Sequence, residues 1–352
     1  MRTEELFLRI ENGLTIEGES FEGLHVTSRA LAEGNFVNCT FDGAVFNDCL
    51  VSDCTFVKCV FRNSVFLRCR FDACMFMRCA IPFCIFEDCK FRSTNFMTSK
   101  LEQATFERCK LLDCNWIASN LEKASFADSG MNRCALLEST FEKIDVAGTS
   151  WHRSTFTKAD LSASDLVGAT FEQVLFAQSN LSYQDFSKQR FKGNTVSDSE
   201  LVGARFQEAD LDHSLFVNCN LEKANFASAN APFAMFAGSN VTEARFDGAQ
   251  LANAVFANAI AVKTSFIGAR LQMGVFDSAD CREARFDRAD LQHADFTHAD
   301  CRAGGFMEAR FEMTRFHGTK TDDINDQGAS GSTLPTDQDR LLAEVYNPDK
   351  VN

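Results

Sequence analysis

Residues 34–53 read GNFVN CTFDG AVFND CLVSD, four blocks of five that share one pattern. Each block has a large apolar residue at its third position, which we call the centre. Stepping by five from Ile16 to Phe316 gives 61 centres, all apolar, in a chain that is only 45% hydrophobic. Of the 36 Phe residues, 33 are centres. The 352 residues are therefore one long internal repeat rather than the two or three domains that the length would suggest.

A second selected position lies two residues before each centre. From Gly34 to Thr314 it is Ala, Cys, Ser, Thr or Gly in 52 of 57 blocks. The exceptions are Ile144, Val174, Gln184, Gln189 and Asn194. Residues two apart in an extended chain share a face, so both selected positions point inward and the other three, polar and mixed, point outward. A period of five fits neither a helix nor a continuous strand, and predicts short extended stretches joined by regular corners.

The blocks Ala159-Asp160-Leu161, Ala209-Asp210-Leu211 and Ala289-Asp290-Leu291 show the repeat most clearly. They resemble the A-(D/N)-L-x-x unit of the pentapeptide-repeat family, and the resemblance covers residues 14–318. It implies an all-β fold, a right-handed quadrilateral parallel β-helix with four blocks in each coil and about 15 coils. Folding the sequence at 20 residues supports the square coil, because it gives two aromatic columns and one mainly aliphatic column. They are Phe36, Phe56, Phe76, Phe96 and Trp116; Phe46, Phe66, Phe86, Phe106 and Phe126; and Leu101, Leu121, Phe141, Leu161, Leu181, Leu201 and Leu221.

The two ends differ from the repeat, as a β-helix requires to cover its terminal coils. Residues 1–13 predict an N-terminal capping helix that ends at Gly13. Residues 14–318 are assigned to the β-helix and residues 319–335, polar and rich in Gly and Ser, to a linker. Residues 336–352 predict a second short helix and a tail. This helix either covers the last coil or reaches a partner.

Cysteine usage indicates core packing rather than chemistry. Thirteen of the 15 Cys occupy the small inward position, and Cys281 and Cys301 are centres. A Cys in such a place behaves as a small hydrophobe. The N-terminus is no signal peptide, and no segment approaches the ~18 apolar residues of a membrane helix, so we expect a cytoplasmic protein without disulfides or membrane contact.

Catalytic patterns are absent from the sequence. We find no glycine-rich phosphate loop and no nucleophile elbow. A filled coil offers no pocket in which a pKa could be shifted. His293 and His298, beside Asp295 and Asp300, are the only hint of a metal or acid–base pair, and we expect them to be solvated. The sequence therefore predicts a non-enzymatic protein without catalytic residues, metal or cofactor.

Two charge patterns run along the outside of the predicted coils. One alternates in sign at a spacing of 20 residues and predicts a salt-bridge ladder. It consists of Asp48, Arg68, Asp88, Arg108 and Asp128. The other, Arg70, Lys90 and Lys110, keeps one sign. It is either a stripe for an anion or an acidic partner, or a solvated edge.

Departures from the repeat are the predicted contacts for a partner. Phe83 and Phe233 are aromatic residues at outward positions, where they suggest interface anchors. Phe233 has the further option of folding over the gap left by Ala231. Tyr183 lies beside three large polar residues on inward positions, which form either a docking notch or a harmless coil. These three are Gln184, Gln189 and Asn194. The apolar stripe of the C-terminal helix completes the set with Leu341, Leu342, Val345 and Tyr346.

These features favour a protein-binding scaffold or adaptor. The net charge of −14 argues against nucleic-acid binding. Both ends of the chain resemble pentapeptide-repeat proteins associated with bacterial type VI secretion, in which the chain would be an accessory or effector-loading component. One alternative is a DNA-mimicking binder of gyrase or topoisomerase, like the quinolone-resistance members of the family. Mimicry needs a dense negative face, whereas the net charge is +1 over residues 35–120 and −7 over residues 121–316. A secreted host-directed effector is the third hypothesis.

Overall fold

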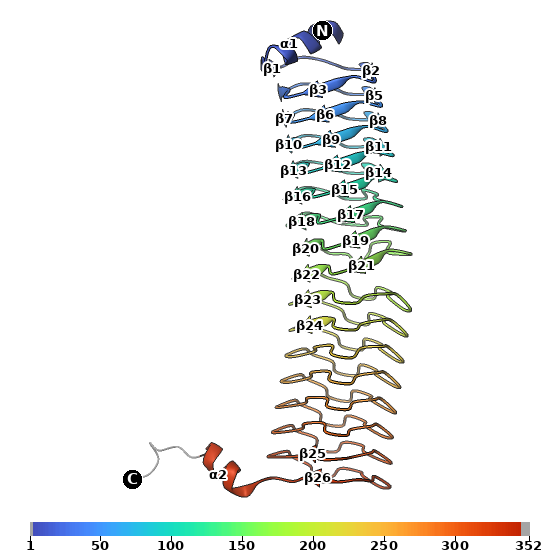
Figure 1. The fold of residues 1–352 in the computed structure, drawn as a ribbon, viewed down its shortest axis with the longest axis vertical. Helices are drawn as coiled ribbons and strands as arrows, with labels where there is room; N and C mark the ends of the chain where they lie inside the picture. Colours follow the sequence, from blue (N-terminus) through green and yellow to red (C-terminus); the bar gives the residue numbers. More distant parts are fainter. Residues whose placement is uncertain (1–2, 346–352) are drawn as a thin grey trace, which may run out of the picture. The chain divides into compact units, whose positions relative to one another are not determined.

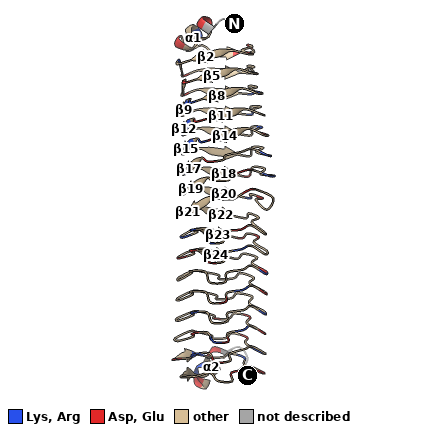
Figure 2. Ribbon diagram, turned by 90° about the vertical axis from the view of Figure 1, so that its right-hand side faces the viewer, with Lys and Arg blue, Asp and Glu red and all other residues tan. Residues whose placement is uncertain are grey.

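The computed structural model describes residues 3–345, which belong to two compact units, residues 1–180 and residues 181–352. In both units the chain winds into a parallel β-solenoid, with helix α1 (Thr3–Glu11) in the first unit and helix α2 (Gln338–Val345) in the second (Figure 1). Acidic and basic residues are interspersed along the coils of both units (Figure 2). The described chain holds no helix with the length and apolar character needed to cross a bilayer. The predicted fold class is confirmed.

Each coil of the first unit has four faces, which we call A to D in chain order. Face A is built from β1 (Ile16–Glu17), β4 (Asn35–Val37), β7 (Thr55–Val57), β10 (Met75–Met77), β13 (Asn95–Met97), β16 (Asn115–Ile117), β18 (Ala135–Leu137), β20 (Thr155–Thr157) and β22 (Leu175–Ala177). Face B has isolated parallel bridges such as Thr40 to Val60. Face C is built from β2 (His25–Thr27), β5 (Val45–Asn47), β8 (Val65–Leu67), β11 (Ile85–Glu87) and β14 (Thr105–Glu107). Face D is built from β3 (Ala30–Ala32), β6 (Leu50–Ser52), β9 (Arg70–Asp72), β12 (Lys90–Arg92), β15 (Lys110–Leu112), β17 (Gly130–Asn132), β19 (Ser150–His152) and β21 (Thr170–Glu172).

The second unit keeps the same register with fewer regular strands. It contains β23 (Thr195–Ser197), β24 (Leu215–Val217), β25 (Thr314–Arg315) and β26 (Thr333–Leu334). Most other contacts between its coils are isolated parallel bridges between residues 20 apart, such as Asn225 to Arg245. We apply the letters A to D to its blocks as well, in the same chain order.

The period of five comes from the residue two places after each centre. This corner residue has a positive φ in nearly every block, for example 52° at Asp48, 54° at Asp53 and 63° at Gly43. Left-handed backbone is uncommon outside glycine, and here it turns the chain after every three extended residues. The next block then begins a new face.

The core consists of centres stacked on the equivalent centres of the next coil. Phe36, Phe56 and Phe76 stack with ring centroids 4.9 and 4.8 Å apart, and Phe46 stacks on Phe66 at 4.9 Å. Centres on neighbouring faces meet edge to face, as in the 72° contact between Phe36 and Phe41. The spacing matches the separation of strands in a sheet, so backbone pairing and ring stacking reinforce each other. The predicted aromatic columns are confirmed.

The N-terminal helix lies against the first coils of the first unit. Leu6, Phe7 and Ile10 are buried, and the guanidinium of Arg29 lies over the Phe7 ring at 4.1 Å. Gly13, with a φ of 65°, follows the helix, and its N–H donates to the carbonyl of Ile10. These contacts agree with the predicted capping role.

The predicted linker over residues 319–335 is wrong. The backbone of Lys320 forms a parallel β-bridge with Asp300, and that of Ser330 forms one with Arg310. Strand β26 pairs with β25. These residues therefore continue the solenoid. The prediction failed because it relied on apolar centres, whereas backbone hydrogen bonds maintain the coil without them. The centre positions of this stretch are Thr321, Asp326 and Gly331, and they are exposed.

All 15 Cys are buried and unpaired, as predicted. Many Sγ–H groups donate to the carbonyl of a centre in the previous coil, such as Cys79 to Phe56 at 3.2 Å and Cys74 to Val51 at 3.3 Å. Burial, which disfavours the thiolate, raises the pKa of Cys54 to about 12 and that of Cys74 to about 11. These two thiols are therefore protonated at neutral pH.

Replacing a stacked centre should cost far more stability than replacing an outward residue of the same block. Phe126 is fully buried and stacks on Phe106 at 4.8 Å. We expect Phe126→Ala to lower the free energy of unfolding by about 3–5 kcal/mol. The exposed corner substitution Asp128→Asn is the control, with an expected change within about 0.5 kcal/mol. Urea denaturation of both variants measures this, and equal losses would contradict the inward and outward assignment.

Alkaline pH should destabilise the fold through its buried thiols. Because the folded-state pKa values of Cys54 and Cys74 lie above the ~8.5 of an unfolded thiol, the unfolded chain loses these protons first. The stabilisation is complete below about pH 8.5 and declines as pH rises towards 11–12. We expect a falling Tm over this range in thermal scans, with a shallower slope in the double variant Cys54→Ala, Cys74→Ala. Equal slopes would rule out these thiols as the cause.

Candidate functional site

The three predicted aromatic contacts are exposed. Phe83, Tyr183 and Phe233 are corner residues with φ of 59°, 63° and 58°, and they are 45%, 71% and 48% exposed. Phe83 belongs to the first unit and the other two to the second. Within the second unit, Tyr183 follows a face B block and Phe233 follows a face D block. They therefore occupy different corners.

Two of these rings lie on the corner of a neighbouring coil. Phe233 stacks on the His213 imidazole with centroids 4.9 Å apart, rather than over the gap at Ala231. The Tyr183 ring covers Gly203, where an added Cβ would lie 2.9 Å from two ring carbons. Gly203 also has a φ of 64°, so both the ring and the backbone favour glycine there.

The predicted notch at Gln184, Gln189 and Asn194 is only partly accessible. Asn194 is fully buried, and its side-chain N–H donates to the carbonyl of Phe191 at 2.9 Å. Its prediction as a partner contact was wrong, because an amide fits the inward position by bonding to backbone. Gln184 and Gln189 are half-buried. The Gln189 side chain donates to the Asp185 carbonyl at 3.3 Å, and its Oε1 is buried without a hydrogen-bond partner.

Helix α2 exposes part of its predicted apolar stripe. Leu342 is 65% exposed, whereas Leu341 is half-buried near Gly318. The Val345 side chain and Tyr346 lie outside the described residues. A hollow of about 210 Å³ remains at the last coil, and no α2 residue lines it. Its walls are Phe306, Phe311, Phe316, Thr321, Ile324, Asp326, Thr333 and Pro335.

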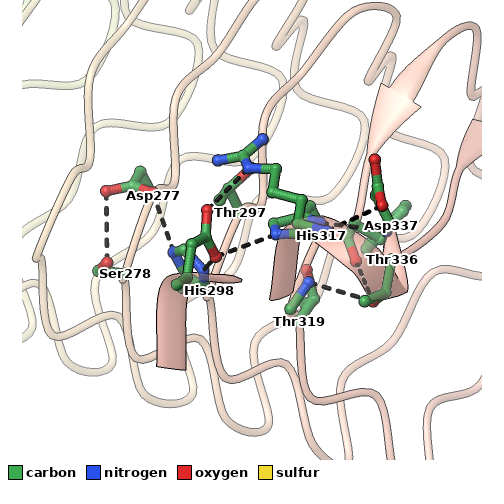
Figure 3. Close-up of polar contacts among 12 residues, drawn as sticks. Asp277, Ser278, Thr297, His298, His317, Thr319, Thr336 and Asp337 are labelled. Carbon is green, nitrogen blue, oxygen red and sulfur yellow. Dashed lines mark hydrogen bonds and ion pairs between the residues drawn. The ribbon is translucent and has the colours of Figure 1, made fainter. Parts of the chain in front are cut away.

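The carboxylate of Glu344 connects α2 to His298 and His317 on the wall of the second unit, and Figure 3 labels these two histidines. Glu344 Oε2 lies 3.0 Å from Nε2 of His298 and 3.1 Å from Nε2 of His317, and Arg340 Nε donates to its Oε1 at 2.7 Å. Arg340 and then the two imidazoles lower the pKa of Glu344 to about 2. The expectation that His298 is simply solvated was therefore wrong. Sequence reasoning missed this contact because its partners are 46 residues apart.

The side chains of His298, His317 and Glu344 are of the types that bind zinc, and their ligand atoms lie within 4.8 Å of one another. The proton arrangement opposes a metal. The backbone N–H of Asp337 donates to Nδ1 of His317 at 3.2 Å, so Nε2 carries the proton of the neutral ring and donates to Glu344. A metal on Nε2 would force a proton onto Nδ1, opposite another N–H. We therefore interpret the cluster as a hydrogen-bonded latch for α2.

Face A of the first unit has a surface that the sequence analysis missed. From β4 to β20, none of the outward residues in its strands is charged, the corner residues aside. One outward column is aliphatic and partly exposed on six successive coils. This aliphatic ladder consists of Val37, Val57, Met77, Met97, Ile117 and Leu137. The prediction that all outward positions are polar and mixed was wrong here, because in-register stacking lets each side chain cover the next.

Charged residues border face A on both corners. Lys58 and Arg78 occupy the corner that follows the face, and Asp53 and Asp113 occupy the corner that precedes it. Reading the outward columns at a spacing of 20 residues, as was done for the centres, would have revealed this uncharged face. The aliphatic ladder can therefore be predicted from the sequence.

Face D of the first unit carries a row of unpaired cations. Lys90 is in register with Arg70 on one side and Lys110 on the other, as predicted. All three are exposed, and no described residue forms an ion pair with them. They line a hollow of about 670 Å³, which we call the basic groove. Its walls also include Leu112, Gly130, Asn132, Ser150 and His152.

Several other charges of this unit, in contrast, are paired between coils. The predicted ladder places Arg68 on Asp48 at 2.9 Å and Arg108 on Asp88 at 3.2 Å. Arg133 pairs with Asp113 at 2.7 Å. The basic groove differs from these pairs because it keeps three cations in register on successive strands.

A parallel solenoid with five-residue faces and left-handed corners defines the class of this protein. The family model for pentapeptide repeats matches in eight copies over residues 134–173, 204–242, 234–272 and 275–312. The chain belongs to the pentapeptide-repeat family.

Solved structures that resemble the chain include other pentapeptide-repeat proteins. HetL, involved in heterocyst differentiation regulation in Nostoc sp. strain PCC 7120, is 18% identical, with 58% of this chain and 88% of HetL covered and a TM-score of 0.26. QnrB1, a plasmid-mediated fluoroquinolone resistance protein, is 20% identical over 61% of this chain and 98% of its own, with a TM-score of 0.23. A thylakoid-lumen protein from Arabidopsis thaliana is 22% identical over 49% and 82%, with a TM-score of 0.13. Comparison with curated proteins finds no match.

Removing the Glu344 charge should release α2 without unfolding the coils. We expect Glu344→Gln to speed hydrogen exchange of the α2 amides while Tm stays nearly unchanged, with Asp339→Asn on the same helix as the control. Because its pKa is lowered, Glu344 stabilises the contact above the ordinary value near 4.3, and this stabilisation is lost as pH falls towards 2. Protection of the wild-type α2 amides by added Zn²⁺ would contradict the latch and indicate a metal site.

Proposed function

We propose that this chain is a non-enzymatic scaffold that binds another protein through face A of its first unit. The observation that carries the proposal is the aliphatic ladder on an uncharged face between charged corners. Interface cores are depleted of charge and enriched in Met, and their rims are polar. Two of the six ladder residues, Met77 and Met97, are flexible side chains that adapt to a partner surface.

The size of the face indicates how a partner must sit. The ladder has six rungs, so at ~4.8 Å per strand it is roughly 24 Å long, and a three-residue strand is about 10 Å wide. The resulting roughly 240 Å² is well below the ~800 Å² that each partner contributes to a stable interface. The corners and a neighbouring face must therefore contribute as well.

The interior of the solenoid supports a role without catalysis. Its centres are stacked rings and aliphatic side chains, and they leave no internal cavity of substrate size among the described residues. The His298, His317 and Glu344 cluster is engaged in holding α2. Family membership agrees with a binding role.

The specific form that we favour is an adaptor that presents or loads another protein. The resemblance of both chain ends to pentapeptide-repeat proteins of type VI secretion supports this form. Phe83, Tyr183, Phe233 and Leu342 are exposed and remain proposed secondary contacts. DNA mimicry has less support, because acidic residues of the second unit are paired. Examples are Asp280 with Arg282, Asp300 with Arg302, and Asp295 with Arg315.

Charges placed on the aliphatic ladder should abolish partner capture. We expect the double variant Met77→Asp, Met97→Asp to weaken binding about tenfold or more, because a desolvated carboxylate is costly in an interface core. The matched control is Ile85→Asp, Val167→Asp, which charges exposed apolar residues of face C blocks. Pull-down from the native cell with mass spectrometry identifies the partner, and thermal scans verify folding. Equal capture by the wild type and the face A variant would refute this interface.

A further inference from the structure

The basic groove on face D has the character of a ligand site. We propose that it binds an acidic peptide segment of the partner protein, presenting two or three carboxylates to Arg70, Lys90 and Lys110. This inference rests on the proposed function and specifies the chemistry of the partner. It concerns face D, whereas the proposed function depends on face A.

The cations of the groove are held against their mutual repulsion. Strands β9, β12 and β15 pair in register, so Lys90 lies directly between Arg70 and Lys110. Like charges directly opposite in a sheet are destabilising. On the same strands, Asp72 and Arg92 are also in register, and there Arg92 Nε donates to Asp72 Oδ1 at 2.8 Å. The same two strands therefore neutralise one outward column and leave the other positively charged.

The hollow beside the cations comes from small residues in the same column. Lys110 is followed in register by Gly130 and then by Ser150. Gly130 has no positive φ, and a Cβ there would meet only Ser150 Oγ at an ordinary 3.6 Å. The backbone therefore does not require glycine. The missing side chain opens the roughly 670 Å³ groove next to the last cation.

Charge and lining identify the occupant. Three cations on successive strands span about 10 Å, which suits two or three carboxylates of a short segment. Leu112, Asn132 and His152 give the groove a mixed wall that suits protein side chains. A nucleic acid needs a longer basic surface, and the net charge of −14 opposes its approach.

The groove also lies within reach of a partner seated on face A. Strand β9 leads through the corner residue Ala73 directly into β10, which carries Met77. One corner therefore separates the cation row from the aliphatic ladder. A partner covering both would gain the contact area that the ladder alone lacks.

The test measures binding of a fluorescein-labelled oligoglutamate peptide by anisotropy, with oligoglutamine as the neutral peptide. We expect binding to the wild type that weakens with added NaCl. Lys90→Glu should weaken it about tenfold or more, and it should also raise Tm, because the new carboxylate lies between Arg70 and Lys110. Gly130→Glu should weaken binding by filling the hollow beside Lys110. Lys100→Glu, an equal charge change on face B, should leave it unchanged.

The following binding results would overturn the proposal. Absence of oligoglutamate binding, or equal binding by wild type and Lys90→Glu, would mean that the cations are only solvated. Stronger competition by a single-stranded oligonucleotide than by the unlabelled peptide would assign the groove to nucleic acid, and equal competition by inorganic phosphate would assign it to small anions. If the peptide does not bind to the basic groove but the face A variant still loses the partner, the proposed function stands. If the peptide binds but no protein is captured, the proposed function fails alone.

Discussion

Within each unit, hydrogen bonding between successive coils places most residues of the repeat in register with the residue 20 positions later, and the rest of the structure depends on this register. In the core, this register stacks aromatic rings of successive coils on one another and places thiols next to thiols. The distance between stacked rings equals the spacing of neighbouring strands in a sheet. Outside, the register gives each side chain a neighbour of defined identity on the coils above and below. A column therefore acts as a physical unit, in which charges are neutralised or repel and apolar groups cover one another.

The sequence predicted the structure correctly at positions where the repeat selects one kind of residue for one structural role. The apolar centres, the buried Cys and the Asp48 to Arg68 pairing all follow from periodicity alone. It failed where hydrogen bonding replaced hydrophobicity, as at buried Asn194 and in the coil around Lys320 and Ser330. It also missed the Glu344 contact, since periodicity does not indicate where a helix beyond the repeat will dock.

The predicted partner contacts were chosen from residues that depart from the repeat. They are Phe83 and Tyr183, which follow face B blocks of different units, and Phe233, which follows a face D block. The coherent surfaces are regular columns, the aliphatic ladder on face A and the cation row on face D, each repeated over several coils. A repeat protein can thus encode specificity by varying which residue type fills a column while the fold stays constant.

The apolar centres shared by the blocks from Ile16 to Phe316 have a consequence for how such a chain can change its length. Loss of five residues leaves every centre apolar, so the interior remains filled. It also moves each following block to the next face. A column of aliphatic residues would then be continued by the residues of a different face. Loss or duplication of 20 residues preserves both the interior and the columns, as the register of Phe56 on Phe76 shows. Evolution of the surface therefore favours whole coils as its unit, although the fold itself tolerates quarter coils.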